Sequence, residues 1–131
     1  MTDVRQKGID LFAQIYGAEM AAGMKAHWES GQFGAELARY ANDIAFGEIW
    51  SRDGLERKMR SCVVLGMLIA LRQSDEIGYH VRMGLANGLT RDELEEILYT
   101  AIPYCGIPAT QSAKAAMLAT LAKIDAAAQE D

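Results

Sequence analysis

The sequence has few of the residues that build metal and redox sites. Its 131 residues include two cysteines and two histidines, and no two cysteines stand at the C-x-x-C spacing. Two imidazoles cannot assemble a histidine-rich metal site within one subunit, although carboxylates keep other metal ligation open. We therefore expect no metal site, and we expect the thiols of Cys62 and Cys105 to be reduced and mostly buried.

The chain also lacks the features by which proteins bind nucleic acid or membranes. Its net charge is −5 with no block of basic residues, and no apolar run approaches the ~20 residues that a membrane-spanning helix needs. We therefore expect neither nucleic acid nor a membrane among its partners. No signal peptide is recognisable, so we expect a cytoplasmic protein. Glycine-rich phosphate loops and the G-x-S-x-G motif of serine hydrolases are absent as well.

Only two prolines interrupt the chain, which is rich in alanine and methionine and shows no alternation typical of strands. Its length suits one domain with its own core. We predict an all-α fold, a single domain over residues 1–131 with about six helices. The expected helices cover residues 3–25, residues 35–49, a segment around 62–71, a segment that Ser74 caps and Asn87-Gly88 ends, a segment that starts with a Thr90–Glu93 capping box, and residues 108–127.

Residues 62–71 form an unbroken apolar run between charged segments. A surface helix shows one apolar stripe, whereas a helix that is apolar all round is buried all round. We therefore expect this helix either to form the centre of the core or to be shared with a partner subunit.

His80 lies on the apolar face of the next expected helix. Such a histidine is usually a core residue, and that interpretation stays open. Glu76, one turn earlier, favours catalysis, because its carboxylate can orient the imidazole and raise its pKa, as a general acid near neutrality requires. Arg60 and Arg72, at the two ends of the apolar run, can supply positive charge for an anionic ligand. Ordinary solvation of helix ends is the alternative role for both arginines.

Several motifs occur in a fixed order between residues 46 and 109: W-x-R-x-G-L, an R-S pair, E-x-x-x-H, A-N-G-L-T-R-x-E-L-x-E and Y-C-G-I-P-A. In this order and spacing they resemble the carboxymuconolactone decarboxylase family, whose stand-alone members also have a similar length. The first 45 residues resemble the family much less. The resemblance implies an all-α fold whose helices interlock between subunits, in a homo-oligomer that is a trimer or a hexamer.

The resemblance also implies a reaction, the decarboxylation of 4-carboxymuconolactone to β-ketoadipate enol-lactone in the breakdown of protocatechuate. The lactone carbonyl can accept the electron pair that the departing carboxylate leaves, so no cofactor is expected. On this basis His80 donates the proton, with Glu76 orienting it, and Arg60 or Arg72 binds a carboxylate of the lactone.

Trp50 and Tyr104 are expected to form the wall of this pocket, with core packing as the alternative for each. His27 is expected to be a surface residue, with entry into a site across a subunit interface as its alternative. The same superfamily contains peroxidases with a C-x-x-C-x-x-x-H motif. Gln73 and Glu76 hold the two cysteine positions here, so disulfide chemistry of that type is not expected.

Two other functions stay open. The same histidine would serve an isomerase or hydrolase that acts on another lactone or unsaturated acid. The chain would also suit a non-catalytic helical oligomer that binds a small acid. The pairing of His80 with a carboxylate one turn earlier favours catalysis, because assembly alone does not require it.

Overall fold

A computed structural model describes residues 2–130, and every regular element among them is helical. This part of the chain contains seven α-helices and one π-helix, and its contacts divide the chain into two compact units, Met1–Glu56 and Arg57–Asp131. The all-α prediction is confirmed. The assignment of residues 1–131 to a single domain stays a prediction.

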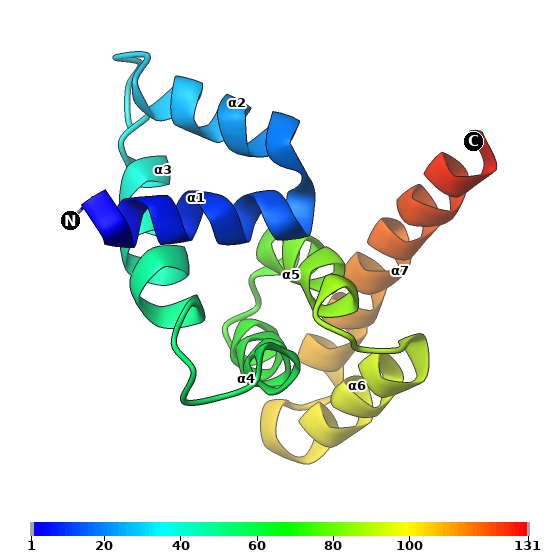
Figure 1. Ribbon diagram of the computed structural model, residues 1–131. Coiled ribbons are helices and arrows are strands. Elements are labelled where there is room, and N and C mark those ends of the chain that lie inside the picture. Colours follow the sequence, from blue (N-terminus) through cyan, green and yellow to red (C-terminus); the bar gives the residue numbers. More distant parts are fainter. Residues whose placement is uncertain (1, 131) are drawn as a thin grey trace. The chain divides into compact units, whose positions relative to one another are not determined.

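The N-terminal unit contains α1 (Thr2–Tyr16), α2 (Ala18–Trp28), α3 (Leu37–Tyr40) and the π-helix η1 (Ala41–Trp50). Helix α1 packs against both α2 and η1 (Figure 1). The prediction of one helix over residues 3–25 is wrong, because Gly17 separates α1 from α2 with a φ of 98°. This left-handed conformation costs glycine little and breaks the helical ladder. The helix predicted over residues 35–49 is present as α3 and η1.

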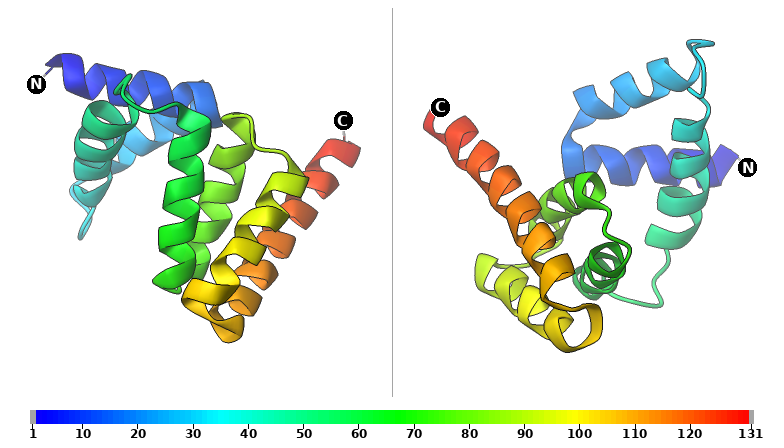
Figure 2. Two further views of the ribbon diagram at one scale, coloured as in Figure 1. Left: turned by 90° about the horizontal axis from the view of Figure 1, so that it is seen from below. Right: turned by 180° about the vertical axis from the view of Figure 1, so that it is seen from behind.

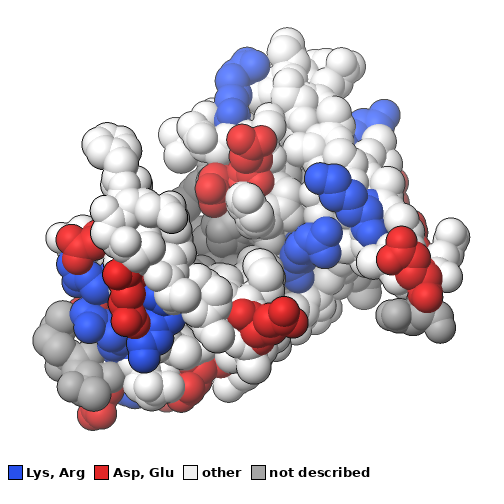
Figure 3. All heavy atoms as spheres, turned by 90° about the horizontal axis from the view of Figure 1, so that it is seen from above, with Lys and Arg blue, Asp and Glu red and all other residues white. Residues whose placement is uncertain are grey.

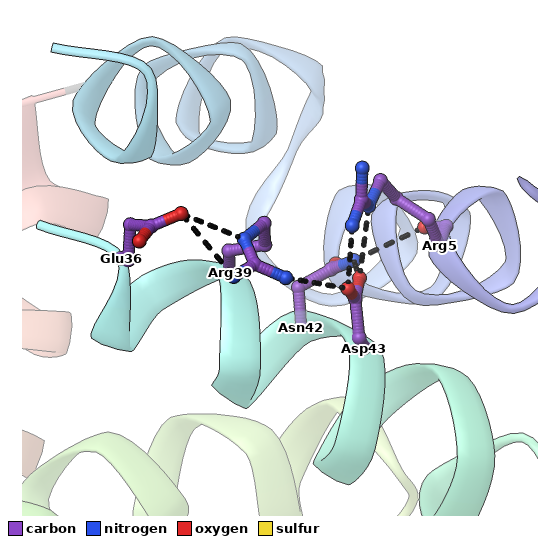
Figure 4. A network of polar contacts seen from close by, with 5 residues as sticks. All are labelled: Arg5, Glu36, Arg39, Asn42 and Asp43. Carbon is purple, nitrogen blue, oxygen red and sulfur yellow. Dashed lines mark hydrogen bonds and ion pairs between the residues drawn. The ribbon is translucent and has the colours of Figure 1, made fainter. Parts of the chain in front are cut away.

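Asp43 on η1 is the centre of a polar network that ties η1 to α1 (Figure 4). Its side chain is 7% exposed, and its two oxygens accept hydrogen bonds from the Arg5 guanidinium, at 3.2 Å from Nε and 2.9 Å from Nη2. The buried Asn42 amide donates to the Arg5 carbonyl oxygen at 3.1 Å and to Asp43 at 3.0 Å. The hydrogen bonds from Arg5 lower the pKa of Asp43, so this carboxylate stays charged and paired near neutral pH.

Two glycines bring the backbones of α1 and η1 into contact. A Cβ atom on Gly8 would lie 2.5 Å from the backbone oxygen of Asn42, and one on Gly47 would overlap the backbone oxygen of Val4. Any side chain at either position would push the two helices apart. The N-terminal unit is therefore held by a close helix contact and by paired polar groups.

The C-terminal unit contains α4 (Arg57–Ala70), α5 (Ser74–Ala86), α6 (Arg91–Cys105) and α7 (Ile107–Glu130). Asn87, just after α5, donates a hydrogen bond of 3.0 Å to Ser61 near the start of α4, so α4 and α5 are antiparallel. Lys58 and Glu93 form an ion pair of 3.0 Å that joins the first turns of α4 and α6. Helices α4 and α6 therefore start at the same end of the unit.

Arg91 at the start of α6 pairs with Asp125 near the end of α7 at 2.6 Å, so α6 and α7 are antiparallel. Taken with the two contacts of α4, this arrangement means that α5 and α7 run in the same direction, as Figure 2 shows. The apolar core of the unit consists of Leu65, Ile69, Ile77, Val81, Leu89, Leu94, Leu98, Ala101, Ala113 and Met117.

The apolar helix predicted around residues 62–71 lies within α4, but burial on all sides is wrong for the single chain. Leu65 and Ile69 are fully buried, whereas Val63, Met67 and Leu71 are 47%, 57% and 66% exposed. Within one subunit, α4 contributes Leu65 and Ile69 to the core, but an apolar stripe of the helix is left exposed. The alternative, a helix shared with a partner subunit, stays a prediction.

The predicted helix ends are mostly confirmed. Thr90 and Glu93 form the capping box, with hydrogen bonds of 3.0 and 3.1 Å between them. Gly88, with a φ of 104°, ends α5 where the sequence predicted a left-handed stop. The predicted cap at Ser74 is wrong, because Gln73 occupies the N-cap position and Ser74 is already the first helical residue.

Acidic and basic side chains are interspersed on the face in Figure 3, where the described lysines and arginines form no continuous area. Within residues 2–130, no helix combines the length and the apolar character that a membrane span requires.

Candidate active site

Helix α5 places His80 at the margin of its buried face. Ile77 and Val81 are 1% and 0% exposed and anchor the helix in the core, while His80, next to Val81 in the chain, is half-buried. Glu76 lies in the first turn of α5, one turn before His80, and is exposed. The pair predicted from the sequence is therefore present on one helix, with an exposed carboxylate and a half-buried imidazole.

The direction of the His80 pKa corrects the expectation drawn from Glu76. Burial lowers the pKa of His80 below its usual value, and the charge of Glu76 raises the pKa by less than burial lowers it. The predicted sign of the Glu76 contribution is right, but the predicted net increase is wrong. Because desolvation disfavours the charged imidazolium, most molecules carry a neutral His80 at neutral pH.

Packing at the C-terminal half of α5 fixes the helix that carries His80. A Cβ atom on Gly84 would lie 2.8 Å from Cδ1 of Leu89, so a larger residue at this position would force the leucine side chain to move. Ser61 is fully buried and accepts the hydrogen bond from Asn87. The serine of the R-S motif thus has a positioning role that its local sequence does not indicate, because its partner lies 26 residues later in the chain.

The two candidate arginines lie at opposite ends of α4. Arg60 is half-buried in the first turns, whereas Arg72 is exposed just beyond the last turn. Twelve residues of helix separate Cα positions by ~18 Å. The two arginines therefore start far apart on one subunit, and the choice between Arg60 and Arg72 as the carboxylate-binding residue stays open.

Arg72 has an unusual backbone conformation, with a φ of 57° that makes it the one non-glycine residue in the left-handed region among residues 2–130. The amide of Arg72 bonds to the carbonyl of Ile69, and the amide of Gln73 bonds to that of Leu68. These two hydrogen bonds form a common C-terminal capping motif of helices, in which glycine usually takes the left-handed position that Arg72 holds here. The end of α4 therefore stores strain of about 1 kcal/mol directly before the helix that carries Glu76 and His80.

Tyr104 and Trp50, the predicted wall residues, lie in different units. Tyr104 is 87% exposed and lines a hollow of about 510 Å³ together with Cys62 and Cys105. His80 is not among the residues that line this hollow. Trp50 ends η1 and is 5% exposed. The wall role of either residue stays a prediction.

Of the remaining candidate metal ligands, the two cysteines line the same hollow, whereas His27 lies in the other unit. Cys62 and Cys105 are free and half-buried, and His27 is exposed on α2. Among residues 2–130, no three side chains of His, Cys, Asp or Glu gather in a way that would hold a metal ion.

Two known proteins share part of their sequence with this chain. The chain is 40% identical over 81 residues to a 4-carboxymuconolactone decarboxylase of Acinetobacter baylyi, an alignment that covers 62% of this chain and 60% of that protein. It is 42% identical over 64 residues to a nitrosuccinic acid decarboxylase of Metarhizium robertsii, which covers 49% of this chain and 45% of that protein. The chain thus spans less than two thirds of the length of either relative.

The family model that matches covers residues 35–119, from the end of the loop before α3 to the middle of α7. Glu76 and His80, as well as Arg60 and Arg72, lie within these residues. Helices α1 and α2 lie outside them. Because the match extends over well more than half of its sequence, the chain belongs to the Carboxymuconolactone decarboxylase family.

Proposed function

We propose that this protein is a decarboxylase that acts on a small carboxylated lactone, with 4-carboxymuconolactone as the first candidate substrate. The observation that carries the proposal is a half-buried histidine with a perturbed pKa, His80, inside the region matched by the family. Both relatives are named as decarboxylases, which supports the same type of reaction.

In the proposed reaction, the bond between the ring carbon and the carboxylate breaks and carbon dioxide leaves. The electron pair of that bond moves into a dienolate that extends onto the lactone carbonyl. The imidazolium of His80 then gives its proton to carbon and recovers one from solvent. Because the substrate provides its own electron sink, we propose that no cofactor takes part.

The lowered pKa of His80 suits this proton transfer in one respect and limits it in another. An imidazolium with a lowered pKa is a stronger acid than a free one, so it releases its proton to carbon more readily. Fewer molecules carry that proton at neutral pH, however, because burial disfavours the charged form. Glu76 partly offsets this loss, because its charge raises the pKa of His80. Glu76 therefore acts on the reaction through His80 and not by contact with the substrate.

The nitrosuccinic acid named for the second relative suggests a second candidate substrate. A nitro group, like a lactone carbonyl, accepts the electron pair that a departing carboxylate leaves. Both acids also retain a further negative charge that Arg60 or Arg72 would bind. We therefore infer that the substrate is a small acid in which loss of carbon dioxide leaves a carbanion that an electron sink within the same molecule stabilises.

The test is to incubate the purified protein with 4-carboxymuconolactone and, separately, with nitrosuccinate, and to measure released carbon dioxide and the organic product. We expect release from one or both acids, unchanged after exhaustive chelation and in a Cys105→Ser variant. A product formed without carbon dioxide would indicate an isomerase or hydrolase. Saturable binding without turnover would indicate a non-catalytic binder of small acids, and dependence on a divalent metal would contradict the proposed chemistry.

We also propose that the protein is a homo-oligomer, a trimer or a hexamer. Met59, Val63 and Met67 are 54%, 47% and 57% exposed and follow one another at four-residue spacing along α4. Such a stripe is typical of a helix face that packs against another subunit. Sedimentation should show an oligomer that Met67→Glu dissociates, and Met20→Glu, at an equally exposed methionine of α2, is the control. A stable species of 14.3 kDa for the parent chain would contradict the proposal.

A further inference from the structure

We propose that a polar hollow between α5 and α7 binds a small carboxylate or phosphate anion, at a site distinct from His80. The hollow has a volume of about 410 Å³, which is within the range of small-molecule sites. It is lined by Ser74, Asp75, Gly78, Tyr79 and Arg82 of α5 and by Ala116, Ala119, Thr120 and Lys123 of α7.

The lining residues form one stripe on each helix, at the i, i+3, i+4, i+7 spacing of a single helix face. The two stripes meet where Gly78 faces Thr120, because a Cβ atom on Gly78 would lie 2.8 Å from the Thr120 hydroxyl oxygen. Small side chains on both helices thus leave space between them.

Positive charge gathers at one end of this hollow. Arg82 lies one turn after Gly78, and Lys123 lies nearly one turn after Thr120. Because α5 and α7 run in the same direction, both cations lie beyond the contact on the same side. Neither cation forms an ion pair with any residue in the described part of the chain.

The acidic side chain of the lining lies toward the other end. Asp75 precedes Arg82 by seven residues, which corresponds to ~10 Å along the helix axis. An anion held by Arg82 and Lys123 therefore occupies the cationic end and is repelled only weakly by Asp75, across a solvated distance. This arrangement favours an anion at that end over a cation.

The Thr120 hydroxyl adds a neutral hydrogen-bond donor to the lining of the hollow. Thr120 is 9% exposed, yet its hydroxyl makes no hydrogen bond within residues 2–130. Thr100 and Thr110 behave differently, since each donates to the carbonyl four residues earlier, at 2.8 and 2.9 Å. The Thr120 hydroxyl faces Gly78 in the hollow instead, where it can donate to an anion oxygen between the two cations.

This site is separate from the candidate active site. Glu76 and His80 lie on a different side of α5 from Asp75 and Arg82, by the 3.6-residue periodicity of the helix. The inference does not depend on decarboxylase activity. Substitutions in the hollow and substitutions at His80 therefore test different claims.

Isothermal titration calorimetry of the whole chain with succinate and, separately, with inorganic phosphate at constant ionic strength tests the proposal. We expect saturable binding of at least one anion, and the anion that binds identifies the ligand as a carboxylate or a phosphate. Arg82→Gln and Lys123→Gln should each weaken binding by about tenfold, because each removes a charged hydrogen-bond donor. Lys114→Gln, also on α7 but outside the lining, should leave binding unchanged.

Three further variants test the roles of the Thr120 hydroxyl and of Asp75. Thr120→Val, which keeps the shape of the side chain, should weaken binding several-fold, and Thr120→Ser should retain it. Asp75→Asn should tighten binding. Circular dichroism of each variant confirms that it is folded. The proposal is overturned if neither anion binds saturably, if Lys114→Gln weakens binding as much as Lys123→Gln, or if folded Thr120→Val binds like the parent.

Discussion

The two units of the chain differ in what surrounds a buried titratable group. In the N-terminal unit, the buried carboxylate of Asp43 receives two hydrogen bonds from Arg5, and this pairing lowers its pKa. In the C-terminal unit, desolvation is the largest influence on His80, and it disfavours the charged form. A group whose charge is stabilised by a close partner is suited to hold structure. A group whose charge is disfavoured is suited to give up a proton, and this difference supports the proposed proton transfer from His80 in the C-terminal unit.

Substitution of His80 should reduce kcat more than any other change, whereas substitution of His27 in the N-terminal unit should not. His80→Gln should keep the fold and lose roughly 10²- to 10⁴-fold in kcat on the active substrate, because the proton donor is gone. His27→Gln, at an exposed position outside the matched region, is the control and should retain full activity. Equal activity of the two variants would show that His80 is not the proton donor. Unfolding of His80→Gln would indicate that His80 is a core residue.

The next prediction concerns Asp43, whose buried carboxylate pairs with Arg5 in the N-terminal unit. Asp43→Asn should lower the free energy of unfolding by about 2 kcal/mol, because it removes the charged acceptor of two hydrogen bonds from Arg5. Urea denaturation measures this change. Gln6→Ala, which removes an exposed hydrogen bond on the same helix as Arg5, should change stability far less. A change in kcat for folded Asp43→Asn would show that the N-terminal unit takes part in the chemistry.

A smaller effect is expected at Glu76. Glu76→Gln removes the charge that partly offsets the desolvation of His80, so the pKa of His80 should fall further. The loss in kcat should be smaller than for His80→Gln, since the imidazole remains. Activity should also decline at lower pH than in the parent. A decline at higher pH would mean that Glu76 does not act on the charge of His80.

The smallest effect is expected at the end of α4. Arg72→Gly should raise the free energy of unfolding by about 0.5–1 kcal/mol, because glycine adopts the left-handed conformation without strain. Arg72→Ala removes the same charge but keeps the strain, so the difference between the two variants isolates the backbone. Thermal denaturation gives that difference, and an alanine variant as stable as the glycine variant would contradict it. Loss of activity in both would assign the substrate carboxylate to Arg72 rather than Arg60.

Local features of the sequence predicted much of this structure. The capping box of Thr90 and Glu93 and the stop at Gly88 involve residues within one turn of each other, and both are present. The separation of Arg60 from Arg72 also follows from the length of one helix. The break at Gly17 was not predicted, because apolar residues continue the helical pattern across it and an isolated glycine is often tolerated within a helix.

Features that depend on tertiary packing could not be predicted from the local sequence. The spacing of Glu76 and His80 indicated that the carboxylate would raise the histidine pKa, and it does. The spacing carried no information on how deeply the imidazole would be buried, and burial decides the net direction. The exposed stripe of Met59, Val63 and Met67 likewise depends on which neighbours cover α4, and the hollow between α5 and α7 depends on the contact of Gly78 with Thr120.

The proposed role of His80 as proton donor is tested by comparing the titration of its imidazole with the pH dependence of activity. The midpoint for the His80 imidazole, measured by NMR with His80→Gln to assign the signal, should lie below the ordinary value of about 6.5. Because the protonated form is the proposed donor, kcat/KM should be highest below this midpoint and should fall as pH rises through it. A midpoint at or above the ordinary value would contradict the lowered pKa of His80. A kcat/KM profile that does not follow the titration of His80 would contradict its role as proton donor.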